Sequence, residues 1–203
     1  MFYGDTLGRS RRLASVGRGS VESYDPPMSD DDERRLRLRE ASYLHSSSRE
    51  ALIEHVFVAE VLQEAWFARE QLVDVLRSEV DAAGYDIVFE CGNVLRHVQL
   101  KASESGGKTS RQTINTHLSE KPGGCVVWVV YSERMEDHRL DLSYLWFGGL
   151  PGEPLPDLGH VVGRNPRSKT PRSGTRVVAR ARFARVASTA ELVERLFGPP
   201  PSA

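Results

Sequence analysis

The sequence predicts an α/β fold in which a central mixed β-sheet is flanked by helices. Three patterns support this fold class. Residues 48–69 have the spacing of an amphipathic helix, residues 86–101 have the pattern of a β-hairpin, and residues 125–131 form a β-branched run typical of a strand buried on both faces. A chain of 203 residues is also long enough to bury a core of its own.

The two ends of the chain have the composition of tails. Residues 1–35 are rich in Gly, Ser, Arg and Asp and contain few apolar residues, which predicts a disordered N-terminal tail. Residues 199–203 follow the last helical pattern and begin with prolines, which predicts a short C-terminal tail. We therefore expect a single domain over residues 36–198.

The first helix is predicted to begin near Ser48, whose hydroxyl can cap the first turn, and to extend to about Arg69. Its apolar stripe is predicted to consist of Leu52, Val56, Ala59, Leu62 and Trp66. Glu54 and Glu60 border this stripe at different angles, so either carboxylate can turn inward toward the sheet. The segment 71–80 fits both a strand and a short helix, and we interpret it as a strand.

A glycine-asparagine pair closes the hairpin as a two-residue turn and so fixes its register. Counting outward from the turn, Ile87 opposes Val98, and Asp86 therefore lies directly across from Gln99. Lys101 shares the face of Gln99 because it is two residues further along the strand. Directly opposed side chains have Cβ atoms about 5 Å apart. The register thus predicts that a carboxylate, an amide oxygen and an ammonium group converge.

The turn before the hairpin contains Gly84, which permits a close approach of the backbone just ahead of Asp86. After the hairpin, the hydroxyl-rich segment 103–110 is predicted to be a flexible loop, and residues 113–119 are predicted to form a short helix. The buried strand at 125–131 follows.

The remaining elements are a strand and a closing helix. The pattern at residues 139–147 predicts a further strand. Ser188 and Glu191 have the spacing of a capping box, and Gly198 ends the helix that follows. The plain interpretation of this helix is structural, as a cover on the sheet.

The hairpin residues carry the chemistry of metal-assisted phosphodiester cleavage. A carboxylate and a second oxygen ligand beside a lysine suit a Mg²⁺ ion that neutralises developing charge while the lysine positions water. The order of an acidic residue, a hairpin and Gln-x-Lys resembles the PD-(D/E)xK nuclease superfamily, in its Gln-x-Lys variant, over about residues 49–131. The chain departs from the family pattern at Tyr85, where the family has proline, and at Gln99, where Asp or Glu is commoner.

The resemblance implies a restriction-endonuclease-like core and a role for each matching residue. Asp86 and Gln99 would be metal ligands, Leu100 would lend its backbone carbonyl to the metal, and Lys101 would be the catalytic lysine. The helix before the hairpin would supply a glutamate, for which Glu54 is preferred and Glu60 is the alternative. The implied cofactor is Mg²⁺ or Mn²⁺.

The implied function is a Mg²⁺-dependent nuclease that hydrolyses phosphodiester bonds, with DNA endonuclease as the favoured activity. A nuclease fold with weakened catalysis, acting as a nucleic-acid-binding or accessory module, is the alternative, because the amide of Gln99 carries no full charge. An α/β interaction protein that does not bind nucleic acid is a third hypothesis.

The net charge of −1 conceals an uneven distribution. Between Leu158 and Ala190 there is no Asp or Glu, and this segment is rich in arginine. Such a local excess of positive charge is typical of phosphate contacts, although a solvated arginine-rich edge strand is the alternative. We predict nucleic-acid contacts from Lys108, Arg111, Arg164, Arg167, Lys169, Arg172 and Arg176.

The cysteines and the apolar segments bear on the cellular compartment. Cys91 and Cys125 both lie in apolar strand-like runs, which is typical of free thiols in a reducing compartment. No apolar run approaches the roughly 18 residues of a membrane span, and the N-terminus lacks the apolar core of a secretory signal. We expect a cytoplasmic protein that is not in a membrane, and we leave open whether it forms a homodimer.

Overall fold

The structure is a computed structural model that describes residues 29–30, 32–34, 36–38, 46–78, 83–165 and 167–200. The chain divides into two compact units, Met1–Ala41 and Ser42–Ala203, which are described separately. In the first unit, the described residues between 29 and 38 are mostly helical and are all exposed. Residues 1–28 of the predicted N-terminal tail, and residues 201–203 of the predicted C-terminal tail, lie outside the described residues.

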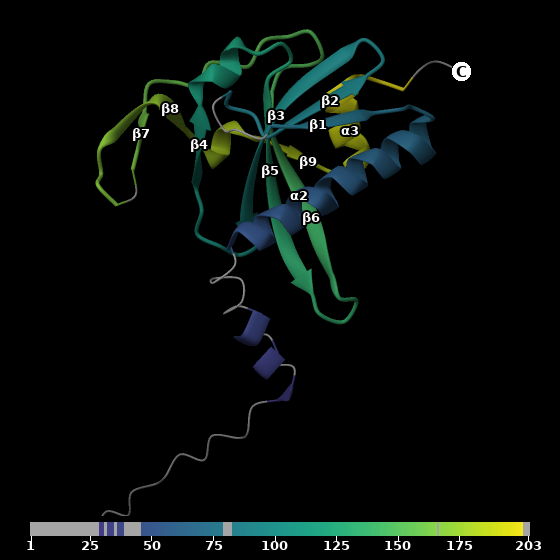
Figure 1. Cartoon of the computed structure of the whole chain (residues 1–203), viewed down its shortest axis with the longest axis vertical. Helices are drawn as coiled ribbons and strands as arrows, with labels where there is room; N and C mark the ends of the chain where they lie inside the picture. The colour runs from purple at the N-terminus through teal and green to yellow at the C-terminus, as the bar shows by residue number, and fades with distance from the viewer. Residues whose placement is uncertain are drawn as a thin grey trace, which may run out of the picture. The chain divides into compact units, whose positions relative to one another are not determined.

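The second unit is built on a mixed sheet of six strands in the order β1-β2-β3-β5-β6-β9. The strands are β1 (Asp74–Arg77), β2 (Ile87–Cys91), β3 (Val94–Glu104), β5 (Cys125–Arg134), β6 (Arg139–Gly148) and β9 (Ala184–Val186). β3 and β5 are parallel, and the other neighbouring pairs are antiparallel (Figure 1). The predicted central mixed sheet is confirmed, and β5 lies inside it with neighbours on both sides.

A second sheet of three antiparallel strands has the order β4-β8-β7. Its strands are β4 (Arg111–Asn115), β7 (Val162–Arg164) and β8 (Pro171–Ala179). The helix predicted at residues 113–119 is wrong in its first half, because β4 occupies this part and only the 3-10 helix η2 (Thr116–Glu120) follows. Asn115 marks the change, since its side chain accepts the His117 N–H at 3.0 Å.

Two α-helices pack on one face of the six-stranded sheet. They are α2 (Ser46–Gln63), which continues as the π-helix η1 (Glu64–Ala68), and α3 (Thr189–Phe197). The stripe predicted for the first helix is wrong: Ile53, Phe57 and Val61 are buried, whereas Leu52 and Trp66 are more than half exposed. None of the helices in the described part of the chain combines the length and the apolar character that a membrane crossing requires.

The closing helix α3 begins with the predicted capping box. Ser188 Oγ accepts the Glu191 N–H at 3.2 Å, and the Glu191 carboxylate in turn accepts the Ala187 N–H at 2.7 Å. Gly198, at φ +90°, ends the helix and donates its N–H to the carbonyl of Glu194. These local contacts fix both ends of the helix, and its apolar residues Leu192, Val193 and Leu196 pack in the core under the sheet.

The six-stranded sheet separates two hydrophobic cores. The larger core lies between this sheet and α2 and α3, and it includes Phe57, Phe89 and Val127. The other core includes Trp128 and Leu118 and is covered by η2, the second sheet and connecting segments. Helices therefore flank the sheet, as predicted, but α2 and α3 lie on the same side.

Both cysteines are free and buried, as their apolar surroundings predict. Burial raises the pKa of the Cys125 thiol to about 11, although the nearby Arg96 acts in the opposite direction. Burial also raises the pKa of the Cys91 thiol. Both groups therefore remain protonated thiols near neutral pH and behave as small apolar side chains.

Candidate functional site

The hairpin of β2 and β3 has the predicted register and then opens. Ile87 is paired with Val98, and the N–H of Asp86 donates to the carbonyl of Val98 at 2.9 Å. β2 starts at Ile87, but β3 continues to Glu104 along β5. The second half of β3 therefore presents a strand edge next to Asp86 that β2 does not cover.

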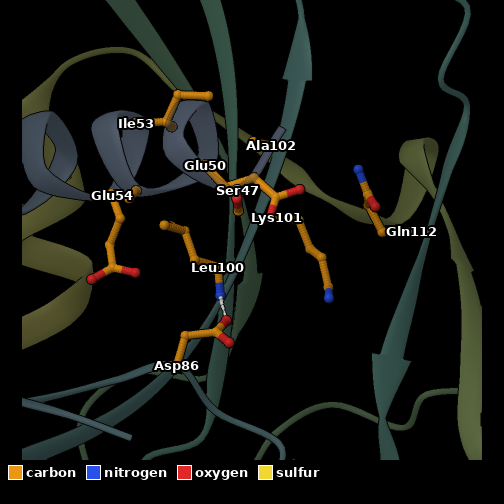
Figure 2. Close-up of a pocket in the computed structure, with 10 residues that line it drawn as sticks. Ser47, Glu50, Ile53, Glu54, Asp86, Leu100, Lys101, Ala102 and Gln112 are labelled. Carbon is orange, nitrogen blue, oxygen red and sulfur yellow. Dashed lines mark hydrogen bonds between the residues drawn. The ribbon is translucent and has the colours of Figure 1, made fainter. Parts of the chain in front are cut away.

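Asp86 binds this strand edge through its side chain. Its Oδ2 accepts the backbone N–H of Leu100 at 2.6 Å, as the dashed line in Figure 2 shows. The N–H and C=O groups of one strand residue point to the same edge. The carbonyl of Leu100 is thus directed to the edge where the Asp86 carboxylate lies, so the two groups implied as metal ligands are neighbours.

A cleft of about 520 Å³ adjoins this edge. Asp86, Leu100 and Lys101 line it from the hairpin, and Gln112 lines it from β4. The first turns of α2 complete the wall with Glu50 and Glu54 (Figure 2). Three carboxylates, an ammonium group and an amide thus share one cleft.

The structure separates the two glutamates that the sequence offered as alternatives. Glu54 lines the cleft, and its Oε1 accepts a hydrogen bond from Arg77 Nε at 2.7 Å. Glu60 instead accepts hydrogen bonds from the hydroxyls of Tyr144 and Thr189, at a place where α2 meets β6 and α3. Burial, followed by the bond to Glu60, raises the pKa of Tyr144. Glu60 is therefore a structural residue in this arrangement.

Glu50 is a cleft residue that the sequence interpretation missed. It lies one helical turn before Glu54, and Figure 2 shows both side chains on the part of α2 that faces β3. Residues four positions apart on a helix are neighbours on its surface. The i, i+4 spacing of the two glutamates was the signal that could have identified Glu50.

Gln99 is placed differently from the prediction. Its side chain is buried, with 4% exposed, and its Oε1 accepts the backbone N–H of Asn115 at 3.1 Å. Gln99 does not belong to the residues that line the cleft. The physical reason is the adjacent end of β4, because its N–H group supplies a donor for a buried amide oxygen that needs one.

The cleft contains oxygen donors of the kind that magnesium and manganese prefer. Among the described residues, no three His, Cys, Asp or Glu side chains form a compact cluster for a metal. Mg²⁺ does not need one, because it keeps several waters and binds through one or two carboxylates. The Asp86 carboxylate and the Leu100 carbonyl are hard oxygen donors on one strand edge, and Glu54 supplies a second carboxylate on the cleft wall.

The predicted nucleic-acid contacts gather on the second sheet and the loop before it. Their positions are Lys108 in the loop after β3, Arg111 on β4, Arg164 on β7, Arg167 and Lys169 in the turn, and Arg172 and Arg176 on β8. All are exposed except Arg176. Its guanidinium donates to the carbonyls of Ser173 and Thr175, so this arginine also supports the local backbone.

The chain matches no protein-family model, and a comparison with curated protein sequences gives no significant match.

Proposed function

We propose that this protein is a metal-dependent nuclease that hydrolyses phosphodiester bonds of DNA in the cleft between α2, β3 and β4. One observation carries the proposal: the Asp86 carboxylate binds the Leu100 N–H at an uncovered strand edge, next to Lys101 and inside a cleft. The resemblance of the hairpin motif to the PD-(D/E)xK nucleases supports it further. A phosphodiester in such a cleft would meet an anionic metal site and a cation together.

In this proposal, Asp86, the Leu100 carbonyl and Glu54 hold Mg²⁺ or Mn²⁺. When bound, the ion neutralises charge on the phosphate and lowers the pKa of a coordinated water. To bind the metal, the Glu54 carboxylate would give up its ion pair with Arg77, in which Nε and Oε1 are 2.7 Å apart. Such an exchange is inexpensive because the guanidinium of Arg77 is about half exposed and can be solvated by water.

Lys101 supplies the catalytic cation of the proposed reaction. Its ammonium orients the attacking water and stabilises the negative charge that develops on the phosphoryl oxygens. The water oxygen forms a bond to phosphorus, the bond from phosphorus to the leaving sugar oxygen breaks, and the proton of the water ends on that leaving oxygen. Glu50, which is exposed on the cleft wall, is placed to take this proton from the attacking water first, and Glu50 then returns a proton through solvent water to the leaving oxygen.

Gln99 acts in this proposal as a positioning residue. Its bond to the Asn115 N–H joins β3 to the end of β4, and β4 carries Gln112 of the cleft wall. Asn115 also contacts the Gly84 turn, which leads into Asp86. Gln99 would therefore influence the reaction through the spacing of the cleft walls.

The test compares two lysine substitutions. Lys101→Ala removes the proposed catalytic cation, and Lys121→Ala removes the same charge from a lysine that contacts the Tyr85 ring instead of the cleft. With Mg²⁺ or Mn²⁺ and plasmid DNA, we expect Lys101→Ala to cut at least about 100-fold more slowly than wild type. Lys121→Ala should cut like wild type, and all three proteins should bind duplex DNA equally. Equal cleavage by Lys101→Ala would refute the assignment.

A nucleic-acid-binding module without turnover is the second candidate. Two observations favour it: Gln99 is turned away from the cleft, and Glu54 is held by Arg77. Mn²⁺ titration separates the two candidates. A nuclease binds Mn²⁺ and loses this binding in Asp86→Ala, whereas a binding module retains DNA but shows no Mn²⁺ affinity that depends on Asp86.

We further propose that the protein acts in the cytoplasm. The two buried thiols, Cys91 and Cys125, are consistent with a reducing compartment. DNA is the proposed partner because the exposed cations of the second sheet would contact phosphates.

A further inference from the structure

We propose that the basic ribbon, defined as β7, β8 and the described turn residues 165 and 167–170, enters the major groove of B-form DNA and restricts the protein to duplex substrates. This inference deepens the proposed function and rests on it for cleavage, but its binding component can be measured separately. Figure 1 shows the ribbon extending outward beside β4, at the far side of the second sheet.

The ribbon is held in shape by its own hydrogen bonds. At its tip, Asn165 donates its N–H to the carbonyl of Thr170, and Lys169 donates its N–H to the carbonyl of Asn165, both at 2.9 Å. The side chain of Asn165 also accepts the N–H groups of Arg167 and Ser168. A preorganised tip loses less conformational entropy on binding than a flexible loop. The ribbon is therefore suited to insertion as a unit.

Cations project from both faces of the ribbon. Arg164 is paired with Pro171, and Arg172 is paired with Gly163. Because neighbouring strand residues point to opposite faces, Arg164 and Arg172 lie on opposite faces. Arg167 is exposed in the turn between them. A ribbon that lies against one sugar-phosphate backbone needs cations on one face only. A ribbon inside a groove has phosphates along both walls and therefore uses cations on both faces.

The acid-free sequence around the ribbon makes it complementary to a polyanion. No Asp or Glu occurs between Leu158 and Ala190, so no carboxylate of this segment neutralises the ribbon arginines. Double-stranded DNA carries about one negative charge per 1.7 Å of its axis. The positive charge of the ribbon therefore favours binding of nucleic acid.

The dimensions of the ribbon favour the major groove of B-form DNA over the other grooves of duplex nucleic acids. Two paired strands lie about 4.8 Å apart, and side chains on the two faces give a ribbon a thickness of roughly 10 Å, the spacing at which sheets pack face to face. The major groove of B-DNA is about 12 Å wide and admits a two-stranded ribbon, whereas the minor groove is about 6 Å wide. In A-form RNA the major groove is deep and narrow. The ribbon therefore fits duplex DNA better than duplex RNA.

The ribbon is joined to the cleft wall by strand pairing. Gln112, which lines the cleft, is paired with Val178 of β8. Where β7 meets β8, Gly163 lies so close to Thr175 that an added Cβ would be 2.2 Å from its Oγ1. Such close packing leaves little freedom for β7 to move relative to β8. DNA held by the ribbon would thus be held at a defined position relative to the cleft.

The experiment measures binding by the double variant Arg164→Ser/Arg172→Ser, with Arg185→Ser as the control. Arg185 is an exposed strand arginine of the same acid-free segment, on β9 and outside the ribbon. Each protein is titrated with one sequence as duplex DNA, duplex RNA and single-stranded DNA, and circular dichroism verifies folding. We expect wild type and the control to prefer duplex DNA by about tenfold or more, and the double variant to lose this preference.

Salt dependence and groove blocking complete the test. Loss of two phosphate contacts should reduce the slope of log affinity against log salt by about 1.8 in the double variant. Methylation of guanine N7, which lies in the major groove, should weaken wild-type binding. Unchanged duplex affinity in the double variant, equal wild-type affinity for all three nucleic acids, or interference by a minor-groove ligand instead of N7 methylation would each overturn the inference.

The outcomes for cleavage distinguish this inference from the proposed function. If no protein cuts DNA but the duplex preference depends on the ribbon arginines, the nuclease proposal fails and the ribbon inference stands. If wild type and the double variant cut duplex DNA equally well and Lys101→Ala does not, the nuclease proposal stands and the ribbon inference fails.

Discussion

Gly84 is the residue whose substitution tests how Asp86 is positioned. It is buried two residues before Asp86 and has a φ of +80°, a conformation that L residues rarely adopt. A Cβ added there would lie 2.9 Å from Asn115 Cγ and 3.1 Å from the Leu118 backbone nitrogen. Both distances are shorter than the roughly 3.5–4.0 Å of ordinary contacts between heavy atoms. Gly84→Ala therefore introduces both backbone strain and a steric clash.

Gly92 separates these two effects. It has a φ of +56° in the hairpin turn, and an added Cβ would meet no atom within 4 Å. Gly92→Ala should therefore lower the free energy of unfolding by the left-handed strain alone, about 1–2 kcal/mol. Gly84→Ala adds an overpacking penalty of about 1–3 kcal/mol, for a total of about 2–5 kcal/mol.

Urea unfolding followed by tryptophan fluorescence measures both free energies, because Trp128 is fully buried in the second core. Gly84→Ala should also weaken Mn²⁺ binding, since relief of the clash displaces the chain that leads to Asp86. The expectation for Gly92→Ala is unchanged Mn²⁺ binding. Equal losses of stability in the two variants would refute the proposed close packing of the Gly84 turn against Asn115.

Two further predictions concern glutamates. Glu54→Gln should reduce cleavage by at least about 100-fold, because it removes a proposed metal ligand. Glu60→Gln should cut DNA like wild type but lose thermal stability, because Glu60 accepts hydrogen bonds from hydroxyls where α2 meets β6 and α3. The reverse result in a plasmid cleavage assay would contradict the assignment of Glu54 as the helix carboxylate. The N–H of Ala187 and then the Arg195 guanidinium hold the pKa of Glu191 below its ordinary value of 4.5. Because the folded-state pKa of Glu191 is lowered, the ionised carboxylate stabilises the fold above pH 4.5, and this contribution is lost as the pH falls further. The urea concentration at the midpoint of unfolding should therefore drop less between pH 6 and pH 3 in Glu191→Gln than in wild type. Parallel curves of midpoint against pH would contradict this.

The hairpin was predictable from sequence because its determinants are local. A two-residue turn at residues 92–93 sets the pairing, and the pairing of Ile87 with Val98 follows from it by counting. The capping box of α3 was predictable for the same reason, since Ser188 and Glu191 are three residues apart. Where structure depends on neighbours in sequence, the pattern of residue types was sufficient.

The buried side of α2 was not predictable from its pattern. Leu52 stands next to Ile53 and Leu62 next to Val61, so two apolar stripes fit the same helical period. Only the larger core, which is built from distant strands, decides that Ile53 and Val61 are the buried residues. Glu54 lines the cleft, whereas Glu60 lies further along the helix and bonds to Tyr144 and Thr189.

The positions of β4 and Gln99 depend on residues that are far apart in the sequence. β4 is stabilised by β8, whose Val178 is paired with Gln112 across a separation of 66 residues. Once β4 is in place, its Asn115 N–H becomes the partner of the Gln99 amide. The sequence interpretation assigned Gln99 to the metal because the hairpin register places it across from Asp86 and because Gln-x-Lys resembles the family motif; it did not include β4, which supplies the observed partner.

Mg²⁺-dependent cleavage of duplex DNA by wild type and Asp86→Asn tests most sharply whether the Asp86 carboxylate holds a catalytic metal. Asparagine has nearly the shape of aspartate, and its Oδ1 can still accept the Leu100 N–H that Asp86 binds at 2.6 Å. The substitution thus removes the charge while keeping the local fold, with a stability loss of only about 1 kcal/mol. We predict metal-dependent cleavage by wild type and at least about 100-fold slower cleavage by Asp86→Asn. Equal rates for the two proteins would contradict it.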